Sequence, residues 1–558
     1  MTSLCAIIFL LATPAFAQTV GGGQQKLHQW DGQGFIDRLG SSVSNAGDVN
    51  GDGFADVIVG AYGADPGGLA DAGSAYVYSG ADGSLLYQWD GGAAVDLFGL
   101  SVSGAGDING DGFADLIVGA FAADPGGLAS AGSAYAYSGV DGSLLYQWDG
   151  GAGLDFFGTS VSDAGDVNGD GFPDVIVGAW GADPGGVLGA GSAYVYSGAD
   201  GSLIHQWNGG ASGDLFGESV SGAGDVNGDG FADLIVGAYF AHPGGLSNAG
   251  SAYVYSGADG SLLHQWDGGT PDVEFGGSVS GAGDVNGDGS ADVIVGAPGG
   301  LFGGGSAYVY SGADGTLLHQ WDSGATFGSS VSGAGDLNSD GFADLIVGAY
   351  LASPGGLVDA GSTFVYSGAD GSLLHQQNGG ATGDLYGHSV SGAGDVNSDG
   401  FADLIIGSWG ADPGGRSSAG SAYVYSFHPF LVASTPTISA SAGGVLDLTL
   451  DFPDTAAVQE YITLMSINGT GPIHYGVDIP LSLDVYLLDS AAGIYPFAIA
   501  SNLHGVLDAS GNATANITFP AGAFNFAIGR TFWLAAVSFP VGQLPAHSSV
   551  AVAVEIEP

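Results

Sequence analysis

The feature that most constrains this chain is a long internal repeat. A phrase of the type GAGDVNGDGFADLIVGA recurs along the sequence, and its first loop aspartate falls at Asp48, Asp107, Asp166, Asp225, Asp284, Asp336 and Asp395. Successive copies are 59 residues apart, except for one interval of 52 residues between Asp284 and Asp336. A fixed period of this kind is typical of architectures in which each repeat is one structural unit that stacks on its neighbours.

Each copy carries four short segments with strand character. In the second copy these are Phe98–Val102, Asp115–Ala120, Ser133–Ser138 and Leu144–Trp148, with a turn at Val140–Gly142. Short apolar or alternating segments joined by Gly, Asp and Pro turns predict a four-stranded antiparallel sheet. Radial repetition of such sheets produces a β-propeller.

The two ends of the repeat region predict how the ring closes. The last copy stops after its third segment, Ser421–Ser426, and continues as Phe427-His428-Pro429. The missing fourth segment occurs at the other end of the chain, as Lys26–Trp30. We therefore predict an all-β fold whose residues 25–427 form a seven-bladed propeller, closed by the N-terminal strand so that no sheet edge stays open.

Two further regions flank the predicted propeller. Residues 1–17 read as a signal peptide, because Leu4–Ala17 is a short apolar run that ends in Ala15-Phe16-Ala17, a small-x-small cleavage site. Cleavage after Ala17 would remove Cys5, the only cysteine, and we expect a secreted protein, extracellular or periplasmic, with no membrane span after residue 17.

The C-terminal region, residues 436–558, is predicted to be a small β-sandwich. It has alternating segments and no stretch of helical periodicity, and Asp508–Asn512 is expected to be a hairpin turn. The expected strands are Val445–Leu450, Tyr461–Ile467, Asn512–Phe519, Thr531–Phe539 and Val550–Ile556.

The charge of the chain excludes some partners. It has 57 acidic residues against four Lys and Arg, a net charge of -53. Nucleic acids and anionic membranes need clusters of Lys and Arg, so neither is an expected partner. Cations, neutral ligands and basic proteins are favoured, and we expect a monomer. The same acidity is also compatible with a saline habitat.

The seven acidic loops have the oxygen ligands that Ca²⁺ prefers. Positions 1, 3, 5 and 9 of each loop carry Asp, Asn, Asp and Asp, and position 6 is a glycine that permits a sharp bend. Asp, Asn and Gly also favour turns without any metal, but seven copies that keep these four residues favour up to seven structural Ca²⁺ sites. The predicted ligands are Asp48, Asn50, Asp52, Asp56, Asp107, Asn109, Asp111, Asp115, Asp166, Asn168, Asp170, Asp174, Asp225, Asn227, Asp229, Asp233, Asp284, Asn286, Asp288, Asp292, Asp336, Asn338, Asp340, Asp344, Asp395, Asn397, Asp399 and Asp403.

The repeats resemble FG-GAP repeats, the family that builds the seven-bladed propeller at the head of integrin α chains. The FG dipeptide that carries this resemblance is present as Phe98-Gly99, Phe157-Gly158, Phe216-Gly217, Phe275-Gly276 and Phe327-Gly328, with Tyr386-Gly387 and Leu39-Gly40 as variants. The GAP tripeptide is complete only at Gly296-Ala297-Pro298. The resemblance implies a Ca²⁺ hairpin at the acidic loops, and a ligand-binding surface on the opposite face of the disc.

The ligand is expected on the face away from the acidic loops, because both deletions in the short repeat fall there. Candidate contacts on that face are Trp180, Tyr239, Phe240, His242, Phe302, Tyr350, Trp409 and Arg416, although such residues could also simply cap the blades. A protein or carbohydrate could bind there, so a recognition, adhesion or scaffold module and a lectin-like multivalent propeller remain alternatives. We expect no enzyme, because no nucleophile–base pair and no unique catalytic polar group is evident.

Two recurring aromatic positions are predicted to be structural. His28, His205, His264, His319 and His375 occupy a strand position that is Tyr87 or Tyr146 in other copies, which indicates packing rather than metal ligation. A tryptophan recurs at the end of the same strand, from Trp30 to Trp321, and is replaced once, by Gln377. This tryptophan is expected to pack at the blade edge, with sugar contact as the alternative.

Overall fold

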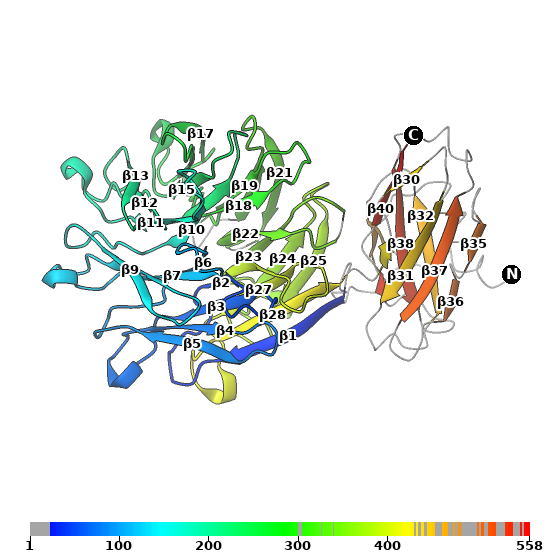
Figure 1. Ribbon diagram of the computed structural model, residues 1–558, viewed down its shortest axis with the longest axis horizontal. Helices are drawn as coiled ribbons and strands as arrows, with labels where there is room; N and C mark the ends of the chain where they lie inside the picture. Colours follow the sequence, from blue (N-terminus) through cyan, green and yellow to red (C-terminus); the bar gives the residue numbers. More distant parts are fainter. Residues whose placement is uncertain are drawn as a thin grey trace.

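The structure is a computed structural model, and it describes residues 23–428 apart from 300–303, 325 and 339, and beyond them only the strands given below. The predicted signal peptide and Phe302 lie outside the described residues. Residues 23–428 form seven four-stranded antiparallel sheets arranged as a ring (Figure 1). We number the blades so that blade 1 contains the first acidic loop.

The innermost strand of each blade is short and contacts the innermost strands of the two neighbouring blades, which closes the ring. These strands are β2 (Val43–Gly47), β6 (Val102–Gly106), β10 (Val161–Gly165), β14 (Val220–Gly224), β18 (Ser278–Gly283), β22 (Ser330–Gly335) and β26 (Val390–Gly394).

The second strand of each blade is the most apolar and is buried along its whole length. These strands are β3 (Asp56–Ala61), β7 (Asp115–Ala120), β11 (Asp174–Ala179), β15 (Asp233–Ala238), β19 (Asp292–Ala297), β23 (Asp344–Ala349) and β27 (Asp403–Ser408). A continuous apolar run fits this place, because both faces of the strand are covered by adjacent blades.

The third and outermost strands complete each sheet. The third strands are β4 (Ser74–Tyr78), β8 (Ser133–Tyr137), β12 (Ser192–Tyr196), β16 (Ser251–Tyr255), β20 (Gly305–Tyr310), β24 (Ser362–Tyr366) and β28 (Ser421–His428). The outermost strands are β5 (Leu85–Asp90), β9 (Leu144–Asp149), β13 (Leu203–Asn208), β17 (Leu262–Asp267), β21 (Leu317–Ser323), β25 (Leu373–Asn378) and, in blade 7, β1 (Gly23–Asp31).

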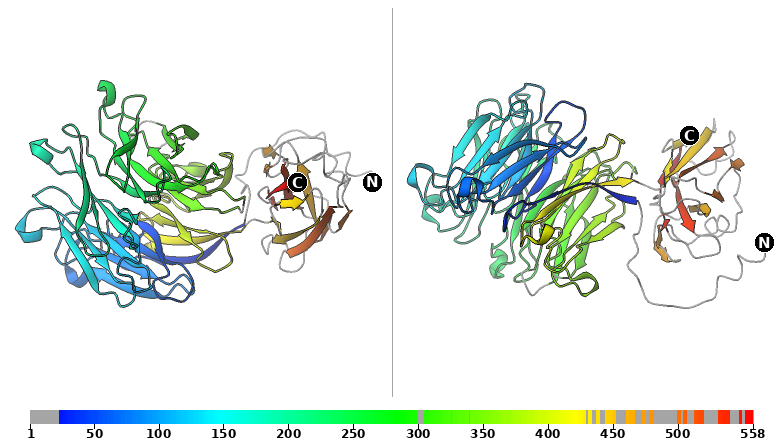
Figure 2. Two further views of the ribbon diagram at one scale, coloured as in Figure 1. Left: turned by 45° about the horizontal axis from the view of Figure 1, so that its top comes forward. Right: turned by 90° about the horizontal axis from the view of Figure 1, so that it is seen from below.

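The seventh blade confirms the predicted closure. Its sheet has the order β1-β28-β27-β26, so the N-terminal strand is paired with the last strand of the repeat region. Antiparallel pairs run from Gly23 opposite His428 to Asp31 opposite Ser421. Figure 2 shows β1 lying along the last blade.

The first strand of each repeat begins later than predicted. The FG dipeptide does not begin a strand; β6 starts at Val102, four residues after Phe98. Phe98 instead makes a parallel bridge with Gly73 of the preceding blade and is buried against Tyr135 and Tyr137. The phenyl ring therefore packs between two blades. Its apolar character is explained by this contact and not by a strand pattern.

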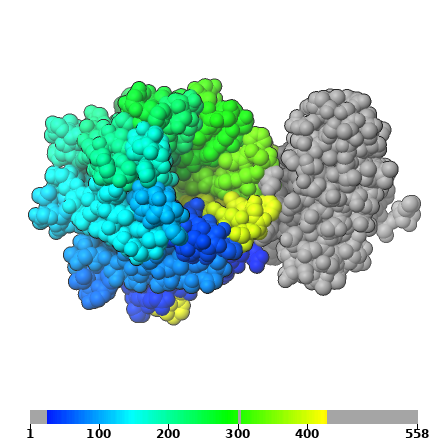
Figure 3. Space-filling view, in the orientation of Figure 1, coloured from blue at the N-terminus to red at the C-terminus, as the bar shows by residue number. Residues whose placement is uncertain are grey.

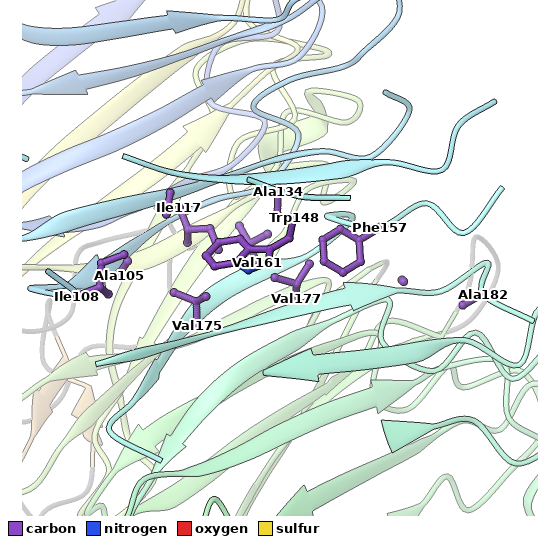
Figure 4. Close-up of a cluster of buried hydrophobic side chains, with 12 residues drawn as sticks. Ala105, Ile108, Ile117, Ala134, Trp148, Phe157, Val161, Val175, Val177 and Ala182 are labelled. Atoms are coloured by element: carbon purple, nitrogen blue, oxygen red, sulfur yellow. The ribbon is translucent and has the colours of Figure 1, made fainter. Parts of the chain in front are cut away.

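The hydrophobic core lies between blades rather than within one of them. Between blades 2 and 3, for example, Ile117 and Trp148 of one sheet meet Val175 and Val177 of the next, with Phe157 beside them (Figure 4). Burial of apolar surface at each such interface makes every blade depend on its neighbours.

The loops separate onto two faces, as predicted. The acidic loop joins the first and second strands, and it shares a face with the turn between the third and outermost strands. The other face carries the loop from the second to the third strand and the connection to the next blade. Most of the loops to the third strand contain one 3-10 turn: η1 (Pro66–Gly68), η2 (Pro125–Gly127), η3 (Pro184–Gly186), η4 (Pro243–Gly245), η5 (Pro354–Gly356) and η6 (Pro413–Gly415).

The described C-terminal strands form two sheets, with the orders β29-β31-β37-β35 and β30-β40-β38-β32-β36, and β39 paired to β38. The strands are β29 (Leu431–Ala433), β30 (Thr437–Ser439), β31 (Gly444–Asp451), β32 (Glu460–Ser466), β35 (Ile499–Ser501), β36 (His504–Val506), β37 (Asn512–Phe519), β38 (Thr531–Phe539), β39 (His547–Ser548) and β40 (Val552–Glu557), with a separate pair β33 (Pro472–His474) and β34 (Asp478–Pro480). The hairpin turn expected at Asp508–Asn512 lies outside the described residues, except for Asn512 at the start of β37. The β-sandwich itself stays a prediction.

Candidate functional site

Each acidic loop is folded by hydrogen bonds from its own backbone to its own side chains. In the third loop, Asp166 at position 1 accepts from the backbone N–H groups of Gly169, Asp170 and Gly171, at 2.6, 3.1 and 2.9 Å. Asn168 at position 3 accepts from Asp170 at 2.8 Å, and Asp170 at position 5 accepts from Phe172 at 3.0 Å. These Asx-type bonds fix the turn and hold the side chains of positions 1, 3 and 5 in place.

The aspartate at position 9 ties the acidic loop to the neighbouring turn. Asp174 is fully buried, and its two oxygens accept from Val167 and Gly198, each at 3.0 Å. Burial raises the pKa of Asp174 to about 6, and repulsion from Asp170 and Asp166 adds to the shift. The three carboxylates of one loop are thus close enough to repel one another, which is a repulsion that a cation would relieve.

The donor set fits a hard cation in its chemistry. Among the residues that the structure describes, however, no three His, Cys, Asp or Glu side chains are gathered tightly enough to enclose a metal ion. In the third loop, backbone N–H groups hold the carboxylates of positions 1, 5 and 9 by hydrogen bonds. Because each carboxylate oxygen has two lone pairs, an oxygen that accepts one N–H can still face a cation.

Blade 7 gives a more specific indication that a cation could bind at the acidic loop. In six blades, one oxygen of the position-9 aspartate accepts a hydrogen bond from the glycine that follows the third strand. Blade 7 lacks that turn, because its outermost strand comes from the N-terminus. There, within the described residues, Asp403 Oδ1 is buried without a hydrogen-bond partner, and burial raises the pKa of Asp403 to about 7. A buried oxygen of this kind is a ready ligand for a cation.

Loop positions 4 and 7 join neighbouring loops. A side chain on Gly110, at position 4 of the second loop, would lie 2.6 Å from the ring of Phe172, at position 7 of the third loop. This contact is missing between the fourth and fifth loops. Ser290 replaces the phenylalanine at position 7 of the fifth loop, and the space beside Gly228, at position 4 of the fourth loop, is empty. Position 4 therefore packs between blades. Its residue type is constrained by this contact and does not vary only because the position supplies no metal ligand.

The predicted ligand contacts on the opposite face divide into two groups. Trp180, Tyr239, Phe240, Tyr350 and Trp409 all follow second strands on that face. By contrast, His242 Nδ1 accepts from the backbone N–H of Asn248, and Arg416 Nε donates to the carbonyl of Gly32. His242 and Arg416 thus stabilise loops.

Four of the predicted contacts, Trp180, Tyr239, Tyr350 and Trp409, belong to a larger cluster around the start of the innermost strands on this face, whose other members were not predicted. We call it the axial cluster. It combines the residue after each second strand with the residues on either side of the FG dipeptide, and its members used below are Arg38, Tyr62, Phe121, Phe156, Trp180, Glu218, Tyr239, Glu274, Tyr350, His388 and Trp409. Figure 3 shows that the ring of blades is hollowed at its middle.

One side of the axial cluster carries positive charge and hydrogen-bond donors. The Arg38 guanidinium lies 4.7 Å from the ring of Tyr62 and 5.5 Å from that of Trp409. His388 packs edge-on between Trp409 and Tyr350, and burial lowers its pKa to about 4. Within the described residues, Arg38 Nε, His388 Nδ1 and Trp409 Nε1 are buried and have no hydrogen-bond partner.

A second side of the axial cluster is acidic, and a third side is aromatic. Burial raises the pKa of Glu218 to about 7. Burial, together with the charges of Glu218 and Glu274, also raises the pKa of Tyr239. Phe156 stacks on Trp180 with 4.4 Å between ring centroids, and Phe121 lies 5.8 Å from Phe156. The axial cluster therefore contains polar groups that occur in one blade only.

These residues could have been found from the sequence, because the positions beside the FG dipeptide vary while the dipeptide stays nearly constant. The residue before the FG dipeptide is Arg38, Leu97, Phe156, Leu215, Glu274, Thr326 or Leu385, while the dipeptide itself barely changes. In all seven blades this variable residue has a positive φ, from 54 to 59°. Such a conformation costs stability for any residue other than glycine, and yet no blade has glycine there.

The recurring Trp and His bond one blade to the next. The indole N–H of Trp89 donates to the carbonyl of Gly142 at 2.9 Å, and its ring stacks on Tyr137 at 4.5 Å. His205 Nε2 lies 2.6 Å from the carbonyl oxygen of Gly257. These contacts confirm the packing interpretation, although most of the tryptophan rings stay partly exposed.

With this geometry established, the comparisons with known proteins identify the family. The pattern of the FG-GAP repeat matches residues 39–78, 98–137, 157–196, 216–255, 275–310, 327–366 and 386–425, one segment in every blade. The repeat region belongs to the FG-GAP family, and it is an FG-GAP repeat β-propeller related to the N-terminal region of integrin α chains. FG-GAP propellers of this kind are generally non-catalytic.

The similar curated proteins are integrin α chains. Integrin alpha-5 of Xenopus laevis is 34% identical over 217 residues, which are 35% of this chain and 20% of the integrin. Integrin alpha-V of Gallus gallus is 33% identical over 218 residues, 34% and 20% of the two chains. The chain thus spans about a fifth of the length of these relatives. In the described part of the chain, no helix has the length and apolar character to cross a membrane.

Proposed function

We propose that this chain is a secreted, Ca²⁺-binding and non-catalytic recognition, adhesion or scaffold module. Its ligand, a protein or a carbohydrate, binds at the axial cluster, on the face opposite the acidic loops. The observation that carries this proposal is the contrast between the two faces. The seven acidic loops are nearly identical, whereas the axial cluster differs in every blade and contains three buried nitrogens that have no partner in the described part of the chain.

Calcium has a structural part in this proposal. In each loop the oxygens of positions 1, 3, 5 and 9 would hold the ion, and in blade 7 these belong to Asp395, Asn397, Asp399 and Asp403. The bound ion would neutralise carboxylates that otherwise repel one another. A ligand present at ten times its dissociation constant stabilises a protein by about 1.4 kcal/mol per site. Seven such sites would contribute roughly 10 kcal/mol, as much as the whole stability of a typical domain.

A thermal melt of the full chain tests the calcium sites. The Tm should be higher by tens of degrees in Ca²⁺ than in excess EDTA, and Ca²⁺ should restore it better than Mg²⁺. A chain with Asp170→Asn and Asp229→Asn should lose part of the Ca²⁺ response, whereas Asp200→Asn, in an exposed turn on the same face, serves as the control. An unchanged melt in EDTA would mean that the loops are turns without metal.

A glycan array and a screen of extracellular-matrix proteins test the ligand face. Binding should weaken at least tenfold in Trp180→Ala and in His388→Ala, while Gln147→Ala on the exposed outer strand β9 leaves it unchanged. One bound ligand per chain supports a single axial site. Several sugars per chain would favour the lectin-like alternative, which has less support because the recurring tryptophans already bond to neighbouring blades.

A further inference from the structure

Three neighbouring blades expose apolar side chains on the outer loops of the proposed ligand face. In blades 7, 1 and 2 the connection to the next blade presents Phe35 (69% exposed) and Ile36 (46%), then Val95 (54%), then Leu154 (57%). The loops beside Val95 and Leu154 add Leu69 (40%) and Leu128 (42%). We call these six residues the rim patch. The backbone N–H of Val95 bonds to Ala70, and that of Leu154 to Ala129, so the two loops of each blade lie together.

Three of these side chains are held on a backbone that disfavours them. Ile36, Val95 and Leu154 have φ values of 64, 68 and 69°. A positive φ is unfavourable for any side chain and most of all for β-branched residues such as Ile and Val. The exposed fractions show that burial in the fold does not compensate for this strain.

The other blades show that the repeat does not need an apolar residue there. The same position is Gly213, Asp272 and Gly383 in later blades, with φ values of 80, 58 and 81°. Glycine and aspartate tolerate this conformation, and the connection keeps its course. The apolar side chains of blades 7, 1 and 2 therefore reduce stability without a structural benefit, and strain of this kind is characteristic of functional positions.

The surroundings of the rim patch specify the charge of its partner. Aspartates stand in the same loops and are fixed by backbone N–H groups: Asp65 accepts from Asp71, Asp124 from Ser130, and Asp96 from Ala93. The whole chain carries a charge of -53. A second copy, an anionic membrane or a nucleic acid would be repelled, whereas a surface with apolar side chains among Lys and Arg would be complementary.

We propose that the rim patch is a docking surface for a cationic amphipathic segment of a partner protein. The apolar side chains of that segment cover Phe35, Ile36, Val95 and Leu154, while its basic side chains pair with the loop aspartates. This inference rests on the proposed function, because it uses the same face of the disc, but it assigns a separate contact outside the axial cluster.

The test uses the full chain in Ca²⁺ and two fluorescent peptides of equal charge. One is an amphipathic helix of Leu and Lys, and the other has every Leu replaced by Ser. The unmodified chain should bind the Leu peptide at least tenfold more tightly than the Ser peptide. The triple variant Ile36→Asn, Val95→Asn, Leu154→Asn should lose this preference, and its Tm should be equal or higher, because asparagine tolerates a positive φ.

The matched control is the triple variant Leu85→Asn, Leu144→Asn, Leu203→Asn. These leucines are each 50% exposed on the other rim of the disc and have no positive φ. This control should keep the preference for the Leu peptide. The proposal is overturned if the rim variant binds as the unmodified chain does, if its Tm falls markedly, or if sedimentation shows that the patch is covered by a second copy. Trp180→Ala should not change peptide binding, so failure of the axial site and failure of the rim patch can be told apart.

Discussion

At the residue scale, the same residue type has different tasks in different blades. Glycine at loop position 4 has φ 72° in Gly110 and 74° in Gly228, so both need the same unusual backbone. Only Gly110 also faces a ring, that of Phe172, whereas the space beside Gly228 is open. One of these glycines is thus required for backbone freedom and for close packing, and the other for backbone freedom alone.

This difference predicts unequal costs for one substitution. Gly228→Ala should lower the free energy of unfolding by about 1 kcal/mol, the cost of a left-handed alanine. Gly110→Ala should cost about 1–3 kcal/mol more, because the added methyl group overlaps the Phe172 ring. Urea denaturation of the two variants in Ca²⁺ measures the difference, and equal costs would show that the ring moves aside freely.

A second residue-scale prediction concerns pH. Burial raises the folded-state pKa of Glu218 from 4.5 to about 7, so the folded chain holds this proton more tightly than the unfolded chain does. The stabilising effect of protonation is fully present below the unfolded pKa and is lost as the pH rises through about 7. Glu218→Gln should therefore raise the Tm at pH 8 but leave it almost unchanged at pH 4. A variant with the same Tm shift at both pH values would contradict the burial of this carboxyl group.

At the element scale, the blades are held together by a regular set of contacts from the outermost strand. Trp148, at the end of β9, is 8% exposed and donates its indole N–H to the carbonyl of Gly201 at 2.9 Å. Its ring also stacks on Tyr196 of the next blade. The contact combines a hydrogen bond with apolar burial, and the corresponding tryptophans repeat it around most of the ring.

Replacement of this tryptophan separates the two contributions. Trp148→Phe keeps an aromatic ring but leaves the Gly201 carbonyl without its donor, and we expect a loss of about 2 kcal/mol. Trp148→Ala should lose about 3–5 kcal/mol because a cavity forms as well. Gln147→Ala, on the exposed face of the same strand, is the control and should change stability by less than about 0.5 kcal/mol. Chemical denaturation gives all three values.

At the scale of the whole molecule, ring closure by the N-terminal strand explains two departures from the repeat. Blade 7 has no turn between its third and outermost strands, because β1 arrives from the N-terminus. In the other blades the tryptophan of the outermost strand bonds to a carbonyl in that turn of the next blade. A tryptophan in the outermost strand of blade 6 would find no such carbonyl in blade 7, and the chain has Gln377 at this position. The same missing turn leaves Asp403 Oδ1 without the N–H group that the other position-9 aspartates accept.

Closure also predicts that the propeller cannot form without β1. Deletion of residues 23–31 would expose the edge of β28 and remove Leu27 and Trp30 from the interface between blades 7 and 1. We expect loss of the cooperative melting transition. A synthetic peptide of residues 23–31, added in trans, should restore it in part. A deletion variant that melts like the unmodified chain would show that closure contributes little.

The sequence by itself determined the architecture, because a repeat of 59 residues with four strand-like segments has few ways to bury its apolar faces. It also indicated the closing strand, since the segment missing after Ser426 occurs at Lys26–Trp30. The loop ligands could be proposed because their spacing is local. The strand predicted at the FG dipeptide is wrong because its apolar residue packs between blades, which no local pattern reveals.

Only the tertiary structure decided what the second face contains. Arg38, Glu218 and His388 are far apart in the sequence, and the ring brings them to one axial cluster because the innermost strands start there. The positive φ of Val95 and Leu154, and the exposure of their side chains, depend on loop contacts made across each blade. Local periodicity records the strands of a repeat protein, whereas its binding surfaces are formed by residues that only closure of the ring places side by side.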